Sequence, residues 1–251
     1  MSFQQLPQVK SYTIAGSNEA ILMIHGFTST PDSFRHLAHR LSKELGWEIH
    51  VPLLPGHGLT YGHLDATSKE SYFYFVENEF EILSQRFEKI HLVGLSMGAA
   101  LCAHLAMKYS SKVQSLVLFS PAMYLRKFTD RFLLPIVRFL PHFILKKWLI
   151  QKPQGTMTEH FSYHTYSVLA VTEFNRVCNA VKKEFVTDKP CLIFSPLNDL
   201  TIHPKSAQWF LDHTRNLKSK IVPLENSPHV VFLGQDNDRI DTETVNFLKA
   251  L

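Results

Sequence analysis

The chain has 251 residues, of which 45% are hydrophobic and 19% charged, with only 10 Gly and 13 Pro. This length and apolar content predict one folded domain with room for an insertion, and they exclude a disordered, collagen-like or low-complexity chain. The formal net charge of +4 is small, so composition alone does not indicate a nucleic-acid partner unless the basic residues cluster.

Predicted strands and helices alternate along most of the chain. Apolar runs predict strands at residues 20–25, 47–51, 90–95, 113–120, 191–195 and 217–224. Helices are predicted at residues 31–45, 67–87, 97–109, 204–212 and 236–251. Thr30 is expected to cap the first helix and Gly46 to end it. The alternation predicts an α/β fold, a mostly parallel sheet with helices on both faces.

The alternation breaks between the fourth and fifth predicted strands. Residues 123–189 are helix-like, punctuated by proline, and rich in aromatic and basic side chains. We therefore predict that residues 1–121 and 190–251 form the α/β core and that residues 122–189 are an inserted helical cap, or lid.

The segment Gly94–Gly98 reads G-x-S-x-G, with Ser96 at its centre. A buried strand runs directly into this motif and a helix of small residues follows it, which is the strand–turn–helix context of a nucleophile elbow. Larger side chains at Gly94 or Gly98 would clash with the adjoining strand and helix. The alternative is an ordinary Gly-Ser turn, and we predict that Ser96 is a nucleophile.

A serine hydroxyl needs a base, and the base needs an orienting group. On this architecture the acid follows a later strand and the histidine follows the last one. Asp199 lies just after the strand at 191–195, where a turn or capping Asp is the alternative. Of the 14 histidines, only His229 follows the last predicted strand. We predict Ser96, Asp199 and His229 as the catalytic residues.

An acyl-transfer intermediate also needs donors for its oxyanion. One donor is expected from the backbone N–H of Met97, directly after the nucleophile, and the other from the backbone N–H of Phe27, after the first core strand. The Phe27 side chain is then available to line an acyl pocket. His25 is expected to be a structural hydrogen-bonding residue rather than a base.

These motifs together resemble the α/β-hydrolases, in particular the small carboxylesterase and monoacylglycerol lipase-like branch. The matching segments are residues 25–31 (HGFTSTP), 54–58 (LPGHG), 94–98 (GLSMG), the Asp199 loop and 227–229 (SPH). The resemblance implies the same triad and oxyanion hole, with residues 56–58 as a structural loop near the site, and neither cofactor nor metal. The chain departs from the family at Ser29, where Gly is frequent, and at Gly234, where an acid often follows the histidine.

The charge is concentrated in the predicted cap. Residues 126–152 hold seven basic residues and one acid, a net +6, so that the remainder is −2. One interpretation is a basic face for weak contact with an anionic lipid surface or substrate, and the other is a solvated basic rim. The many apolar residues interleaved there argue against nucleic acid, and they indicate that the cap lines the acyl pocket.

The leading hypothesis is a serine hydrolase that cleaves small-molecule carboxylic esters of small or medium acyl chains, with monoacylglycerol as one candidate substrate. A thioesterase, amidase or perhydrolase would use the same triad, and a non-catalytic ligand-binding protein on this scaffold is the alternative class. Three widely spaced cysteines, no predicted signal peptide and no uninterrupted membrane span indicate a cytoplasmic protein. The oligomeric state is left open.

Overall fold

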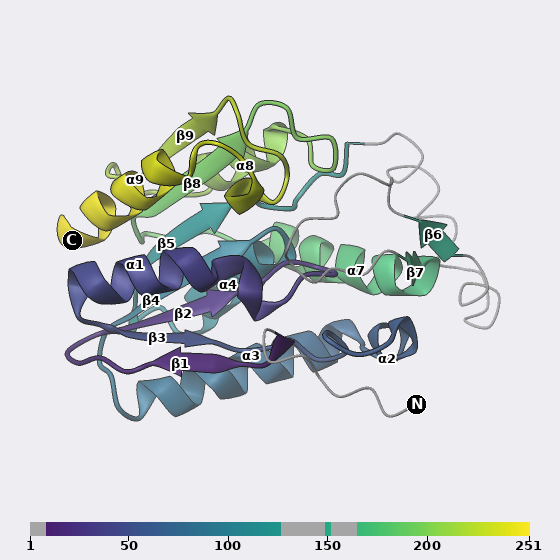
Figure 1. Cartoon of the computed structure of the whole chain (residues 1–251), viewed down its shortest axis with the longest axis horizontal. Helices are drawn as coiled ribbons and strands as arrows, with labels where there is room; N and C mark the ends of the chain where they lie inside the picture. Colours follow the sequence, from purple (N-terminus) through teal and green to yellow (C-terminus); the bar gives the residue numbers. More distant parts are fainter. Residues whose placement is uncertain (1–8, 127–148, 152–164) are drawn as a thin grey trace.

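The computed structural model describes residues 9–126, 149–151 and 165–251. Its main feature is a seven-stranded sheet of order β1-β3-β2-β4-β5-β8-β9, in which every neighbouring pair is parallel except β1 and β3 (Figure 1). The strands are β1 (Tyr12–Ile14), β2 (Ala20–Ile24), β3 (Glu48–Val51), β4 (Ile90–Leu95), β5 (Val113–Phe119), β8 (Cys191–Pro196) and β9 (Lys220–Leu224).

Helices cover both faces of the sheet. The helices are α1 (Arg35–Leu45), α2 (Tyr61–Asp65), α3 (Lys69–Ser84), α4 (Met97–Lys108), α7 (Val168–Glu184), α8 (Lys205–Asp212) and α9 (Asn237–Lys249). Successive side chains of a strand point to opposite faces. On β2, Ile21 accordingly packs in one core with Leu37 of α1 and Ile240 of α9, and Leu22 packs in the other with Leu101 of α4. Burial on both faces explains why β2 is apolar throughout.

The predicted α/β alternation is confirmed, with differences at particular elements. Strand β1 was not predicted, because it has three residues, is partly exposed and depends on antiparallel pairing with β3 for its definition. Thr30 does not act as a helix cap. The chain passes through a short 3₁₀ turn, Pro31–Phe34, before α1 begins, and the buried Thr30 hydroxyl has no hydrogen-bond partner within the described chain. Gly46 ends α1 in the left-handed conformation, as predicted.

The segment between β5 and β8 contains α7 and also a short hairpin, in which β6 (Leu149–Gln151) pairs antiparallel with β7 (Thr165–Ser167). Residues 127–148 and 152–164 lie outside the described residues, and they hold all the basic side chains of the predicted basic segment except Arg126. The +6 charge of that segment therefore remains a property of the sequence. Among the helices that are described, none has the length and apolarity needed to cross a bilayer.

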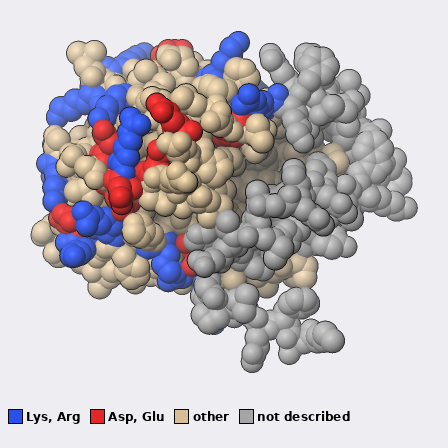
Figure 2. Space-filling view, turned by 45° about the horizontal axis from the view of Figure 1, so that its top comes forward, with Lys and Arg blue, Asp and Glu red and all other residues tan. Residues whose placement is uncertain are grey.

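On the face of the molecule seen in Figure 2, Lys and Arg side chains lie among Asp and Glu side chains rather than in a patch of one sign. Several of the described charges are paired. Lys249 lies 3.0 Å from Glu44, and Lys220 lies 2.7 Å from Glu243. The face of the described core seen in this view therefore has charges of both signs.

Candidate active site

The predicted site residues meet at one edge of the sheet. Phe27 lies after β2, Ser96 after β4, Asp199 after β8 and His229 after β9. Since these strands are parallel, their carboxyl ends point the same way, and open α/β sheets bind ligands at this edge. Four loops that are far apart in the sequence therefore converge there.

Ser96 occupies a strained turn between β4 and α4, with φ 55° and ψ −112°. Its two flanking glycines are required sterically. A Cβ at Gly98 would fall 1.9 Å from the carbonyl oxygen of Ile24, and a Cβ at Gly94 would fall 2.6 Å from the nitrogen of Ala99. A positive φ at a residue other than glycine costs free energy. An ordinary Gly-Ser turn does not need a serine in this conformation. The conformation is that of a nucleophile elbow.

A chain of hydrogen bonds joins the three predicted catalytic residues. The Ser96 Oγ lies 3.0 Å from His229 Nε2, and His229 Nδ1 lies 2.7 Å from Asp199 Oδ2. The second carboxylate oxygen, Oδ1, accepts from the backbone N–H groups of Thr201 at 2.7 Å and Ile202 at 2.8 Å. With its Nδ1 proton donated to the carboxylate, the imidazole presents Nε2 as an acceptor to the serine hydroxyl.

The environment of Asp199 favours its charged form. Burial of this carboxyl would raise its pKa. The hydrogen bond and charge of His229, together with the two backbone N–H groups, lower the pKa by more, so that it lies below its ordinary value. The carboxylate is therefore ionised at neutral pH and able to orient the imidazole.

The loop after β2 lies directly against the elbow. A Cβ at Gly26 would come 3.2 Å from the Ser96 Cβ, so only glycine allows this approach without displacement. Met97 is the first residue of α4, where backbone N–H groups lack intrahelical partners and the helix dipole favours negative charge. Phe27 stacks on Phe174 of α7, with ring centroids 5.3 Å apart and planes 13° apart.

A family model for the α/β hydrolase fold matches residues 19–146, more than half of the sequence. The chain belongs to the α/β-hydrolase fold family. The resemblance stated from the motifs is confirmed, and so is the predicted fold class.

The sequence of this hydrolase is similar to those of proteins named as lipases and esterases. A thermostable monoacylglycerol lipase of Bacillus sp. (strain H-257) is 28% identical over 236 residues, which cover 90% of this chain and 89% of that protein. A carboxylesterase of Bacillus subtilis (strain 168) is 23% identical over 244 residues, covering 96% and 97%. The chain is therefore an esterase- and monoacylglycerol-lipase-like α/β hydrolase.

Solved structures share the fold over nearly the full length. One, from work on the metagenome-derived lipolytic enzymes LipS and LipT, has a TM-score of 0.87 at 21% identity and covers 99% of this chain and all of that one. A soluble variant of monoglyceride lipase from Saccharomyces cerevisiae has a TM-score of 0.73 at 18% identity, covering 95% and 90%.

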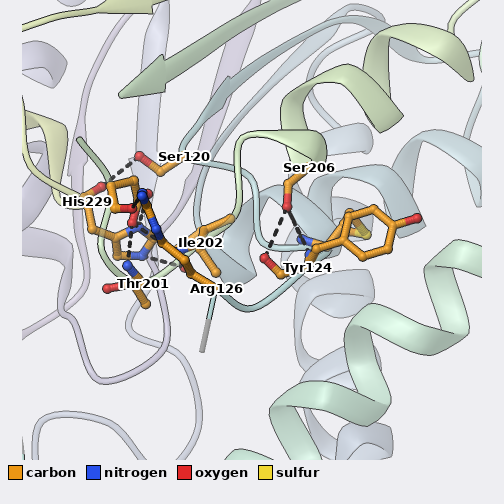
Figure 3. A network of polar contacts seen from close by, with 10 residues as sticks. Ser120, Tyr124, Arg126, Thr201, Ile202, Ser206 and His229 are labelled. Carbon is orange, nitrogen blue, oxygen red and sulfur yellow. Dashed lines mark hydrogen bonds and ion pairs between the residues drawn. The ribbon is translucent and has the colours of Figure 1, made fainter. Parts of the chain in front are cut away.

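Two residues that support the candidate triad were missed from the sequence (Figure 3). The hydroxyl of Ser120, after β5, donates to the main-chain carbonyl of His229 at 2.7 Å. The guanidinium of Arg126 donates to the main-chain carbonyl of Asp199. Ser120 carried no sequence signal, and Arg126 was counted only as part of the charge of the predicted cap.

The segment that leaves β5 is tied at further points to the Asp199 loop and to α8, which follows that loop. Leu125 forms a bridge with Ile202. The N–H of Tyr124 donates to the Ser206 Oγ at 2.9 Å, a contact drawn in Figure 3. The first residues of the predicted cap and the loop of the catalytic acid candidate therefore form one hydrogen-bonded unit.

The loop that carries His229 is held by Asp236, which also had no role in the sequence analysis. Its Oδ2 accepts from the Ser227 hydroxyl at 2.7 Å and from the Asn226 N–H at 2.9 Å. A Cβ at Gly234 would fall 2.5 Å from the Ser227 Cα. Glycine at position 234, where the family often has an acid, therefore allows the backbone there to approach the backbone of Ser227 closely. The acidic residue of this chain is Asp236, two positions later.

Proposed function

We propose that this hydrolase cleaves carboxylic esters, with Ser96 as nucleophile, His229 as general base and acid, and Asp199 as the orienting carboxylate. The backbone N–H groups of Phe27 and Met97 form the oxyanion hole. The observation that carries the proposal is the hydrogen-bonded chain from Ser96 through His229 to Asp199 at 3.0 Å and 2.7 Å.

The geometry supports a two-step acyl-enzyme mechanism. The Ser96 Oγ attacks the ester carbonyl carbon while His229 Nε2 takes the hydroxyl proton. The resulting tetrahedral oxyanion is stabilised by the two backbone N–H groups. When the intermediate collapses, the imidazolium gives its proton to the leaving alcohol, and the acyl group stays on Ser96. A water molecule, deprotonated by His229, then releases the acid by the same route.

We propose small-molecule esters of small or medium acyl chains as substrates, with monoacylglycerol among them. The lipase and carboxylesterase names of the relatives support this class. Residues 122–189 would be the cap, and α7 would supply part of the acyl pocket. The contact between Phe27 and Phe174, with Leu64 and Ala170 packed beside it, supports an apolar wall next to the proposed oxyanion hole.

Two further expectations accompany this proposal. The seven basic residues of 126–152 would give the cap weak affinity for anionic lipid, and binding to anionic vesicles should then weaken as salt rises. Vesicle binding that does not depend on salt concentration, or the absence of binding, would support the interpretation of these residues as a solvated basic rim. A cytoplasmic location also remains a prediction, and the free thiols of Cys102, Cys178 and Cys191 fit a reducing compartment.

The deciding experiment combines active-site labelling with a substrate series. A fluorophosphonate should label the wild-type protein at Ser96 and leave the Ser96→Ala variant unlabelled. The p-nitrophenyl esters from acetate to palmitate, a monoacylglycerol, and a matched thioester and amide then define the preferred substrate. Folded protein that is not labelled would contradict the serine-hydrolase proposal, and labelled protein with faster thioester or amide turnover would contradict the ester assignment.

A further inference from the structure

Two buried histidines lie beneath the loop that carries Phe27. His25 is fully buried and His57 is 1% exposed, and their rings meet edge to face with centroids 5.0 Å apart. The proposed chemistry of Ser96, His229 and Asp199 uses neither ring. Burying two titratable rings costs free energy unless each polar atom has a hydrogen-bond partner. The partners of the ring nitrogens therefore show which groups the two histidines hold in place.

His25 is bonded to the peptide group that contains the proposed oxyanion donor. Its Nε2 accepts from the Leu54 N–H at 3.0 Å, so the ring proton is on Nδ1, which donates to the Gly26 carbonyl at 3.0 Å. The Gly26 carbonyl and the Phe27 N–H belong to one planar peptide group. A hydrogen bond to the carbonyl therefore orients the N–H and, by polarising the peptide, strengthens it as a donor.

His57 holds the next peptide group along. Its Nε2 accepts from the Thr28 N–H at 3.1 Å, and its Nδ1 donates to the Pro55 carbonyl at 2.9 Å. Thr28 has φ 64°, a left-handed conformation that is unfavourable for a β-branched residue. Such a conformation persists only when its surroundings hold it. The bond to His57 is one such restraint, and it acts on the residue directly after Phe27.

Both rings must be neutral for these bonds to form, because each uses one nitrogen as donor and the other as acceptor. The environment of His25 favours this state. Burial, reinforced by the neighbouring His57, holds the pKa of His25 well below its ordinary range. His25 is therefore neutral at neutral pH, as its two hydrogen bonds require.

We infer that His25 and His57 are positioning residues, which hold the two peptide groups on either side of Phe27 so that its N–H points to the substrate oxyanion. This inference rests on the proposed function, because it needs an oxyanion at Ser96. The competing explanation is that the two histidines only anchor the loop of residues 54–57. A structural role alone would change stability without selectively weakening binding of the tetrahedral species.

The test compares two substitutions at His57. His57→Gln keeps an acceptor near the Nε2 position, and His57→Leu removes it. We measure kcat, KM and the inhibition constant of a trifluoromethyl ketone, whose tetrahedral adduct with Ser96 carries an oxyanion. For His57→Leu we expect kcat to fall about 10²-fold, the KM to stay within about threefold, and the ketone to bind more weakly by a factor that matches the loss of kcat. The kcat of His57→Gln should be at least about tenfold higher than that of His57→Leu.

His91 supplies a matched control. It is 1% exposed, like His57, and its ring has two hydrogen bonds, to Ser115 Oγ and to Glu19 Oε2, each 2.7 Å. It is the second residue of β4, however, on the order of 15 Å along the strand from Ser96. His91→Gln and His91→Leu should lower the melting temperature while leaving kcat and the affinity for the ketone unchanged in the folded fraction.

The same logic applies to His25 and covers the case in which His57→Leu does not fold. His25→Asn retains an N–H donor near the Nδ1 position and His25→Val does not, so the Asn variant should keep more of the kcat and bind the ketone more tightly. The inference would be overturned if the retaining and removing variants had equal kcat and ketone affinity, or if the His91 variants lost both to the same extent. Fluorophosphonate labelling distinguishes failure of this inference from failure of the proposed function. Wild-type protein that is not labelled would overturn the proposed function itself.

Discussion

Ser120 and His229 are 109 residues apart, yet the Ser120 hydroxyl donates to the main-chain carbonyl of His229 at 2.7 Å. Ser120 is itself left-handed, with φ 43°, and its N–H donates to the carbonyl of Phe194 on β8 at 2.9 Å. His229 follows β9, which lies at the end of the sheet order. The general base candidate is therefore held from β5, near the centre of the sheet, as well as from its own loop.

Loss of the Ser120 hydroxyl should reduce catalysis. In Ser120→Ala the His229 carbonyl loses a buried donor, and we expect kcat to fall about tenfold because the imidazole is less often aligned with Ser96. Ser115→Ala is the matched control. It removes a hydroxyl from β5, the strand that leads into Ser120, and this hydroxyl bonds to His91. Similar losses of kcat in the two folded variants would contradict a positioning role for Ser120.

The candidate triad should behave as a unit. We expect Ser96→Ala and His229→Ala each to lower ester turnover by about 10⁴-fold or more, and the double variant to lose little beyond either single one. Steady-state kinetics on a p-nitrophenyl ester measures this. His36→Ala is the control, since the His36 side chain is 73% exposed and pairs with Asp241 rather than with the triad. A loss of less than tenfold at Ser96 or His229 would mean that other residues carry the reaction.

The elbow should not tolerate a methyl group at Gly98. In Gly98→Ala the new Cβ would lie 1.9 Å from the Ile24 carbonyl oxygen, which belongs to the backbone of β2. We expect the free energy of unfolding to fall by about 3 kcal/mol or more, because backbone must move. In the control Gly62→Ala, in α2, the new Cβ would lie 3.7 Å from the Thr60 Oγ1, its nearest neighbour. This substitution should leave the free energy of unfolding unchanged or raise it by about 0.5 kcal/mol. Equal stability of both variants in chemical denaturation would contradict the tight packing of the elbow.

The three thiols should be unreactive in the folded protein. Burial raises the pKa of Cys178 to about 12 and that of Cys191 to about 11, and it also raises the pKa of Cys102. Because the thiolate is the reactive form, raised pKa values leave these groups protonated at pH 8. We expect Ellman's reagent to react slowly with native protein and with all three thiols once it is unfolded. Rapid reaction of a full thiol equivalent under native conditions would contradict this burial.

The elbow could be predicted from sequence because its requirements are local. A buried strand, two glycines around a serine and a helix of small residues lie within one short stretch, and each of these features follows from sterics. The two loops of Asp199 and His229 were found from their order after later strands. Strand β1 escaped prediction because three half-exposed residues carry too little periodicity, and the capping role assigned to Thr30 was wrong because a 3₁₀ turn precedes α1.

The amino-acid sequence by itself determined the α/β alternation and the residue types available at the carboxyl edge, because burial and backbone sterics act between near neighbours. The tertiary structure alone decided that Ser96, His229 and Asp199 come within hydrogen-bond distance. It also decided that His57 bonds to Thr28 and Ser120 to His229. Such bonds join residues that are 29 to 133 positions apart, and their existence depends on how the packed sheet orients each strand end, which no local pattern of side chains encodes.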